Sequence, residues 1–179
     1  MLDMENLQKL AEQVGFTHIG PLDRSTIELR TEVREMCRTG NCGASGKKWS
    51  CPPGCGTLEE CRQRLDRYTS GILVQTVGQL EDSLDYEAMI ETEAEHKQHF
   101  ADLEKLLRKQ YPDMLAIGAG ACTKCRECTY PDAPCRFPEQ AFASMEAYGM
   151  LVLQVCKSNH MTYYYGPETI AYTSMFLLE

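Results

Sequence analysis

Ten cysteines in a chain of 179 residues constrain this protein more than any other feature of its sequence. Nine of them fall in two stretches, residues 37–61 and 122–135, and only Cys156 stands apart. The chain starts with acidic residues, where a secretory signal carries basic residues followed by an apolar stretch. Because disulfides are rare in a reducing compartment, clustered cysteines in such a chain indicate metal ligands rather than bridges. We therefore expect a cytoplasmic metal-binding protein.

Composition and charge exclude several classes of protein. The 18 basic residues are outnumbered by 26 acidic ones, and a net charge of −8 argues against a general nucleic-acid binder or a protein that binds anionic membranes. No apolar stretch approaches the ~20 residues that a transmembrane helix needs. An apolar fraction of 43% is ordinary for a globular core. We expect one domain over residues 1–179, with no nucleic acid or membrane as partner.

The hydrophobic pattern predicts a mixture of helices and strands. Helical spacing of apolar residues predicts helices over residues 5–14, 25–36, 58–68, 84–110 and 138–148, and a further helical or buried segment over 149–160. Short apolar stretches predict strands over residues 16–20, 71–77 and 114–119, and the tail is typical of two strands around a Gly166-Pro167 turn. A strand, a long helix and another strand in succession favour parallel pairing of strands 71–77 and 114–119. We expect an α+β domain with one mixed β-sheet, helices packed on it, and two cysteine-rich loops at its edge.

The second cysteine loop gives the most specific chemical signal. Cys122, Cys125 and Cys128 are separated by two residues each, which is how the bacterial ferredoxin pattern for a 4Fe–4S cluster begins. Cys135 follows after six residues instead of three, and the longer gap would let it fold back onto the same cluster. Zinc also takes four cysteines, but usually as two separated pairs. We therefore expect a 4Fe–4S cluster on this loop, with zinc as the alternative.

The first cysteine loop is dense but less regular. Its candidate ligands are Cys37, Cys42, Cys51 and Cys55, with Cys61 as an alternative to Cys55. Five cysteines exceed the four that a cubane cluster takes, so either one is spare or the cluster is held by only Cys37, Cys42 and Cys51 and one iron has no protein ligand. Ligation by four thiolates suits electron transfer, whereas an iron with an open position can bind a substrate.

Several residues other than the cysteines could act at a metal site or have only a structural role. Trp49 either shields a cluster from water or packs as a core aromatic, and Lys48 either offsets a cluster's negative charge or lies on a solvated turn. Glu146 either reaches a cofactor or stays at the surface. The histidines show no ligand spacing, and we expect His96 and His99 on the solvated face of the long helix.

Two segments together resemble the DUF2284 family, which consists of prokaryotic predicted metal-binding proteins. They are the stretch from Cys37 to Pro53, which ends in WSCPP, and CTKCRECTYPDAPCRFP from Cys122 to Pro138, which SMEAYG follows. The resemblance spans nearly the whole chain and implies metal binding, but no particular reaction. The matching cysteines are Cys37, Cys42, Cys51, Cys122, Cys125, Cys128 and Cys135.

These features support three functional hypotheses. The first is an iron–sulfur protein with two 4Fe–4S clusters that passes electrons to or from a redox partner protein. The second is an enzyme that binds a small substrate at the open iron of a cluster held by three cysteines. The third is a zinc-stabilised interaction domain. Tyr163–Tyr165 and Met175–Leu178 offer an edge for a homodimer, although a paired inner strand would explain them as well.

Overall fold

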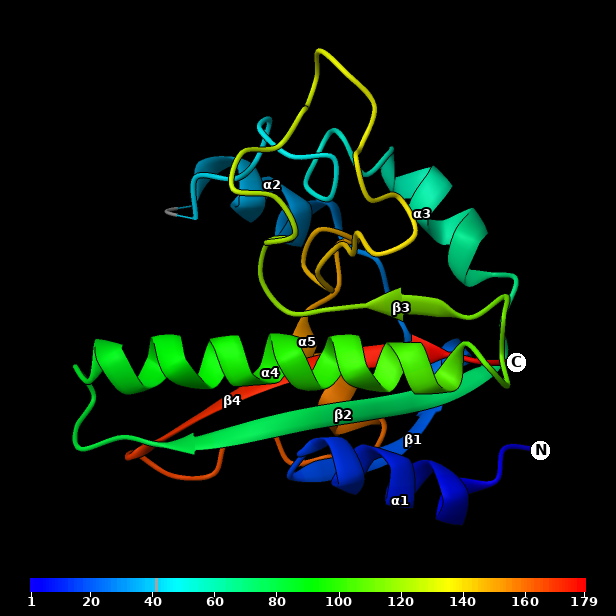
Figure 1. The fold of residues 1–179 in the computed structure, drawn as a ribbon, viewed down its shortest axis with the longest axis vertical. Helices are drawn as coiled ribbons and strands as arrows, with labels where there is room; N and C mark the ends of the chain where they lie inside the picture. The colour runs from blue at the N-terminus through cyan, green and yellow to red at the C-terminus, as the bar shows by residue number, and fades with distance from the viewer. Residues whose placement is uncertain (41) are drawn as a thin grey trace.

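The computed structural model describes residues 1–40 and 42–179 as an α+β fold, which confirms the predicted class. In that part of the chain, four strands form one sheet in the order β1-β2-β4-β3 (Figure 1). The strands are β1 (His18–Asp23), β2 (Ser70–Gln79), β3 (Leu115–Ile117) and β4 (Thr169–Leu177). The helices are α1 (Met4–Val14), α2 (Thr31–Thr39), α3 (Leu58–Leu65), α4 (Tyr86–Leu107) and α5 (Val152–Ser158), with a short 3-10 helix, η1 (Arg24–Thr26).

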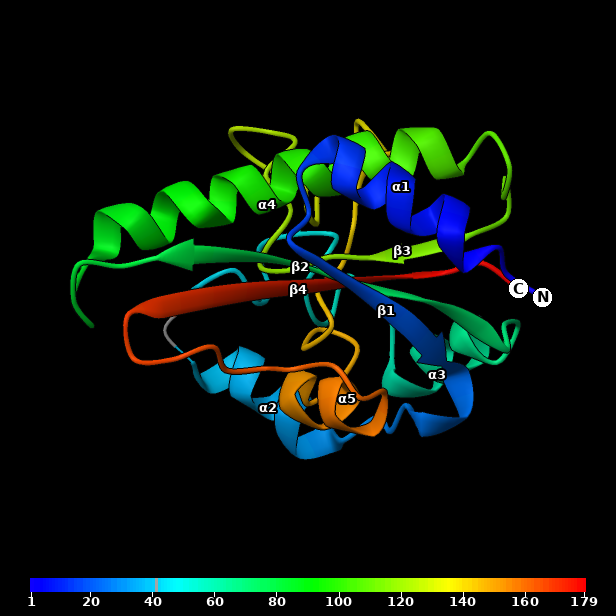
Figure 2. The same ribbon diagram turned by 90° about the horizontal axis from the view of Figure 1, so that it is seen from below.

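The helices form a layer on each side of the sheet. Helices α1 and α4 cover one face, while α2, α3 and α5 lie on the other side (Figure 2). None of the helices in the described ranges is both long and apolar enough to cross a membrane.

The pairing of the strands differs from the prediction. Strands β2 and β3 run in the same direction, but each pairs with β4 in antiparallel fashion, so the parallel pairing expected between them is wrong. The C-terminal strand lies between them because it forms a long ladder with β2, from Gly71 opposite Leu177 to Gln79 opposite Thr169. Every ladder of the sheet within the described residues is therefore antiparallel, and the sheet is not the mixed one that was predicted.

The tail contributes one strand rather than the two predicted. The segment before Thr169 is irregular, because side chains rather than a ladder attach it to the sheet. The Tyr165 hydroxyl donates to Gln75 Oε1 at 2.7 Å, and Gln75 Nε2 donates to the Thr162 carbonyl oxygen at 2.9 Å. Residues 175–177 of β4 are paired on both sides, so the inner-strand explanation of the apolar tail is confirmed for them.

Two predicted helices are also corrected. Residues 138–148 form turns instead of a helix, because this segment bonds to the end of β3: Gly118 N donates to Ala143 O at 2.9 Å and Met145 N to Gly118 O at 3.2 Å. The second helix begins at Thr31 rather than near Ser25. The Asp23 carboxylate accepts from the Ser25 amide at 2.8 Å and so caps η1, after which the chain is extended to the start of α2.

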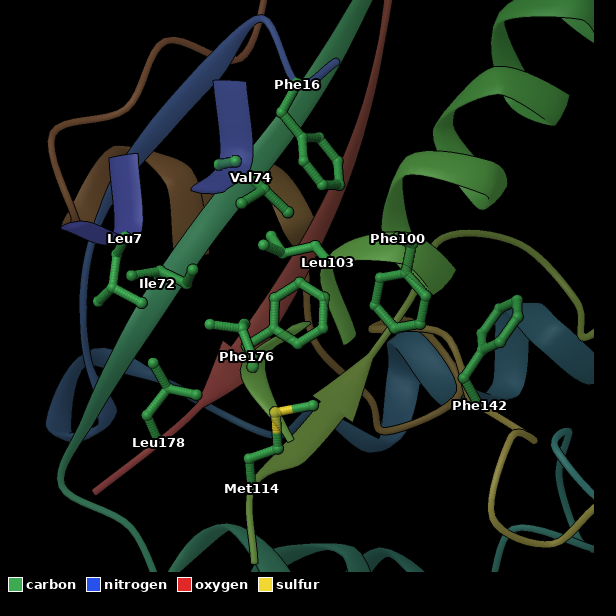
Figure 3. Packing of buried hydrophobic residues seen from close by; sticks show 12 residues of the cluster. Leu7, Phe16, Ile72, Val74, Phe100, Leu103, Met114, Phe142, Phe176 and Leu178 are labelled. Atoms are coloured by element: carbon green, nitrogen blue, oxygen red, sulfur yellow. The ribbon is translucent and has the colours of Figure 1, made fainter. Parts of the chain in front are cut away.

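The core lies on both faces of the sheet. Between the sheet and the α1–α4 layer, the Phe100 ring stacks on Phe176 with centroids 4.9 Å apart and meets Phe142 at 5.2 Å (Figure 3). The same layer also buries polar side chains, and His96 of α4 is fully buried and not on a solvated face as predicted. Its Nδ1 lies 3.0 Å from Thr76 Oγ1 and its Nε2 lies 2.6 Å from Ser174 Oγ. Polar partners on two central strands thus satisfy both ring nitrogens. His99, predicted on the same face, is half-buried, with its Nδ1 3.1 Å from Thr76 Oγ1.

Candidate metal centre

The two cysteine-rich loops lie side by side beyond β3 and form one lobe (Figure 1). The Nζ of Lys48 donates to the carbonyl oxygen of Cys122 at 2.7 Å, and the Nε1 of Trp49 donates to that of Ala133 at 3.0 Å. The Trp49 ring also meets Tyr130 edge-on, with centroids 4.9 Å apart. Lys48 and Trp49 therefore attach the first loop to the second, and Lys48 does not lie on a freely solvated turn.

The predicted ligands of the second loop are gathered around one small cavity. Its walls are Lys48, Trp49 and Ser50 from the first loop, with Lys124, Ala141 and the four cysteines Cys122, Cys125, Cys128 and Cys135. Cys135 thus joins the other three despite the longer gap in sequence. All four sulfurs belong to half-buried residues on a backbone without regular structure.

The surroundings of Cys128 favour its thiolate form. Burial opposes ionisation, but backbone N–H groups of Trp49, Tyr130 and Thr129 donate to the sulfur, and Lys48 adds a positive charge. Together these contacts lower the pKa of Cys128 below its ordinary value. The thiolate is the form that ligates a metal, so the contacts of Cys128 favour ligation by this residue.

The first loop gathers three of its cysteines near a carboxylate. Burial raises the pKa of Cys37, and the nearby charges of Glu146, Cys42 and Cys51 raise it further, while Arg34 opposes them. Glu146 follows the second cysteine loop in the chain, and its approach to Cys37 depends on the turns of residues 138–148. The sequence left two roles open for Glu146, one at a cofactor and one at the surface.

The two candidate sites adjoin at Cys51. Burial raises the pKa of the Cys51 thiol, against a hydrogen bond from the Ser50 hydroxyl and the charge of Lys48. The charge of Cys122, in the other loop, acts on the same thiol. Lys48, Trp49 and Ser50 therefore form a wall of the second site, and the next residue, Cys51, is a predicted ligand of the first.

A cavity of about 640 Å³ opens beside Cys42 and Cys51. Glu146 and Tyr163 line it, and Tyr172 closes it from β4. On the α4 side it contains the ion pair of Lys97 and Glu93, whose Nζ and Oε1 lie 2.5 Å apart. The open-iron hypothesis requires such a space next to the first loop.

Cys55 and Cys61 share Arg34 as a neighbour, and Cys55 is joined to Cys51 by a bond from its amide to the Cys51 carbonyl oxygen at 3.1 Å. The neighbouring Cys55 thiol, with help from Arg34 and Arg64, lowers the pKa of Cys61 to about 7, and the same interaction raises the pKa of Cys55. The Cys55 sulfur lies 3.8 Å from the Ala147 carbonyl oxygen, and the Cys61 sulfur lies 3.9 Å from that of Cys55. Arg34 Nη2 lies 3.6 Å from Cys55 Sγ, and its Nη1 lies 3.9 Å from Cys61 Sγ. Sequence reasoning weighed Cys55 and Cys61 only as competing ligands, and the role of Cys55 as fourth ligand stays a prediction.

The donor set fits a thiolate-bound metal. In residues 1–40 and 42–179, no three His, Cys, Asp or Glu side chains converge closely enough to hold a single ion as placed. The cysteines of the second loop instead surround a common cavity, and soft thiolates are the ligands that both iron–sulfur clusters and zinc accept.

Comparison with known proteins supports metal binding. Residues 20–178 match the family model DUF2284, which is described as a predicted metal-binding protein. The matched range includes all ten cysteines and nearly the whole fold. Neither a curated protein nor a solved structure matches the chain.

Proposed function

Because the chain belongs to the DUF2284 family of predicted metal-binding proteins, we propose that it is an iron–sulfur electron carrier with one 4Fe–4S cluster on each cysteine-rich loop. The observation that carries this proposal is the cavity of the second loop, around which Cys122, Cys125, Cys128 and Cys135 are gathered. On the first loop, the proposed ligands are Cys37, Cys42 and Cys51, of which Cys42 and Cys51 lie close enough to Cys37 for their charges to act on it.

The residues around the second cavity would set the properties of a cluster there. A bound 4Fe–4S cluster supplies one-electron redox chemistry. The N–H groups that donate to the Cys128 sulfur and the charge of Lys48 would stabilise added negative charge. Trp49 packs against Tyr130 at the wall of the site, where it would shield a bound cluster from water.

Transfer between two clusters requires that they lie close together. Residues 48–51 support this proposal, since the segment borders the second site and ends in a predicted ligand of the first. Electrons would then enter at one cluster and leave from the other to a larger redox partner protein.

A second candidate function is supported by the cavity of about 640 Å³ beside Cys42 and Cys51. A cluster held by Cys37, Cys42 and Cys51 leaves one iron without a protein thiolate, and this cavity gives a small thiol or sulfide room to reach it. Glu146, near Cys37, would then face the bound substrate.

The composition of the bound metal tests the main proposal. The protein is purified without oxygen, and iron, sulfide and zinc are quantified, with spectra before and after dithionite. We expect about eight irons and eight sulfides per chain and bleaching on reduction. Zinc without sulfide would contradict both redox functions and support a zinc-stabilised interaction domain.

Thiol binding tests the second candidate. A small thiol or sulfide is added to the metal-loaded protein, and its electron paramagnetic resonance spectrum is followed. The open-iron function predicts a saturable change that Tyr163→Ala weakens without loss of metal, because Tyr163 lines the cavity. Tyr164→Ala is the matched control, since that ring is 67% exposed and lies outside the cavity lining. An unchanged spectrum in the wild type would exclude an accessible iron.

A further inference from the structure

A cavity of about 780 Å³ is bounded by both cysteine-rich loops, by Arg64 of α3 and by Tyr148. Its volume is typical of a site for a small molecule, and the functions proposed above do not use it. Most of the residues at its walls are apolar, among them Trp49, Phe142 and the prolines at positions 131, 134 and 138. The apolar part of a bound molecule would therefore be withdrawn from water here.

Two side chains at one wall offer hydrogen atoms for which the protein supplies no acceptor. The Nη1 of Arg64 donates to the carbonyl oxygen of Cys55 at 2.7 Å and lies 3.4 Å from the Tyr148 hydroxyl. Within residues 1–40 and 42–179, neither the Nε and Nη2 of Arg64 nor the hydroxyl hydrogen of Tyr148 bonds to an acceptor. Tyr148 is only 4% exposed, and a buried donor without an acceptor costs free energy. A ligand that accepts hydrogen bonds at this wall would remove that cost.

The charge of Arg64 also lacks a carboxylate partner. Glu60, one turn earlier on α3, is directed to the start of the helix, where its Oε2 accepts from the Thr57 amide at 2.6 Å. Asp132 lines the cavity but is exposed. In the part of the chain that the structure describes, neither acid forms an ion pair with Arg64. A guanidinium beside a hydroxyl donor suits a carboxylate, because its two oxygens accept hydrogen bonds side by side.

The apolar walls are held in place from behind. The Trp49 ring meets Tyr130 edge-on with centroids 4.9 Å apart, and its Nε1 donates to the Ala133 carbonyl oxygen at 3.0 Å. Phe142 packs against Phe100 of α4 with centroids 5.2 Å apart (Figure 3). Walls that are fixed before binding lower the entropy cost of enclosing a ligand.

We propose that this cavity binds a small organic carboxylate, with the acid group on Arg64 and Tyr148 and an apolar body against the apolar walls. An inorganic anion would use the same donors but leave the apolar walls uncovered. A neutral apolar molecule would cover the walls but leave the donors of Arg64 and Tyr148 without an acceptor. An organic acid with an apolar body satisfies both parts of the cavity.

The cavity also borders the second metal site. Cys135, a predicted ligand there, lines both this cavity and the smaller one around Cys128. A carboxylate bound to Arg64 would add negative charge near the second cluster and make its reduction potential more negative. This consequence alone rests on the proposed function.

Calorimetric titration of the metal-loaded full chain, without oxygen, tests the binding site. The probe is 3-phenylpropionate. Its matched compounds are 3-phenylpropionamide, which carries no charge, and propionate, which has no ring. We expect saturable binding of the probe and about tenfold weaker binding of each matched compound, because each lacks one of the two groups that the cavity complements.

Variants locate the acid group. Arg64→Met removes the charge and should weaken binding of the probe by about tenfold. Tyr148→Phe removes only the hydroxyl and should weaken binding severalfold, so it preserves the test if Arg64→Met does not fold. Arg62→Met is the matched control on the same helix and should bind the probe as the wild type does, since Arg62 pairs with Glu59 and lies outside the cavity lining.

Several outcomes would overturn the proposal. One is a wild type that does not bind the probe at ~10 mM, or that binds the acid and its amide equally. Unchanged binding in both Arg64→Met and Tyr148→Phe is another. Loss of metal from Arg64→Met, with unchanged binding in Tyr148→Phe, would assign Arg64 to a metal site instead.

Metal analysis and a redox titration separate this proposal from the proposed function. A chain that binds the probe but contains zinc and no sulfide would contradict the cluster proposal and leave the carboxylate site standing. If the chain holds clusters, saturating probe should make the potential of one of them more negative, and Arg64→Met should abolish this shift. An unchanged potential would overturn the effect of the bound acid on the cluster.

Discussion

The ammonium group of Lys48 donates a hydrogen bond to the carbonyl oxygen of Cys122 at 2.7 Å, across 74 positions of the chain. This bond joins the two cysteine-rich loops and places a positive charge at their shared wall. The charge opposes the rise that burial causes in the pKa of Cys51, and it contributes to the lowered pKa of Cys128. A charge at this position can act on both candidate sites.

Replacement of Lys48 should therefore weaken metal binding. Lys48→Met removes a charge-assisted hydrogen bond, so we expect affinity at the second site to fall by about tenfold, the equivalent of about 1.4 kcal/mol. If the site holds a cluster, its reduction potential should become more negative, because the added electron loses a nearby cation. Chelator competition and a redox titration measure both effects. Lys47→Met is the matched control, since Lys47 is exposed, and equal losses in both variants would show that Lys48 has no special role.

Loss of Cys128 should remove the metal of the second site alone. Cys128→Ser replaces a sulfur that backbone N–H groups stabilise as a thiolate with a hydroxyl, which is a poor ligand for iron or zinc. Under the two-cluster proposal, iron should fall from about eight to about four per chain. Cys156→Ala should retain all of the metal, because Cys156 is buried against Gln75, with Nε2 and Sγ 3.8 Å apart. Full iron content in Cys128→Ser would remove this residue from the ligand set.

Burial of His96 should make the protein less stable in mild acid. Burial, assisted by His99 and Lys97, lowers the pKa of His96 from 6.5 to about 3. Between these values the unfolded chain binds a proton that the native state does not. The free energy of unfolding should therefore fall by about 1.4 kcal/mol per pH unit as the pH drops below about 6.5. Denaturant unfolding at pH 7 and pH 5 measures this loss.

Release of metal in acid would also lower the free energy of unfolding. The test therefore compares the wild type with a variant that lacks the titrating group. His96→Gln keeps a polar side chain near Thr76 and Ser174 but removes the titrating group. The variant should lose about 2 kcal/mol less than the wild type between pH 7 and pH 5. Equal losses would mean that His96 takes up its proton in the native state.

Truncation of Phe176 should destabilise the fold more than any exposed change on α4. Phe176 is fully buried and stacks on Phe100 at 4.9 Å, so Phe176→Ala should cost about 3–5 kcal/mol of unfolding free energy. Ile90→Ala, at a side chain that is 67% exposed, should change it by no more than about 0.5 kcal/mol. Thermal or denaturant unfolding of the metal-loaded proteins checks the contrast.

The regular elements were largely predictable because their signals are local. The predicted helix over 5–14 is α1 to within one residue, and the buried strand predicted over 71–77 lies inside β2. Apolar periodicity identifies such elements, since one face of each is buried against the same sheet. The wrong predictions concern which segments bond to each other. Strands 71–77 and 114–119 both pair with the C-terminal strand instead of with each other, and residues 138–148 bond to the end of β3 instead of forming a helix.

In the candidate site, too, the local features were predictable and the contacts between distant residues were not. The spacing of Cys122, Cys125 and Cys128 is a local property, because residues three positions apart on a tight loop lie near each other whatever surrounds them. The approach of Cys135 to the same cavity was predicted from loop length. The burial of His96 was not predicted, because its partners Thr76 and Ser174 carry no signal of their own.

The sequence by itself determined that this chain is an α+β protein with two cysteine-rich loops, since composition, periodicity and cysteine spacing act over short stretches of chain. Only the tertiary structure decided which residues meet across the loops. It brings Lys48 to Cys122, Glu146 to the neighbourhood of Cys37, and Arg34 to both Cys55 and Cys61. These contacts depend on how the segments before α3 and after β3 pack beside one sheet, and packing between distant segments leaves no periodic pattern in the sequence.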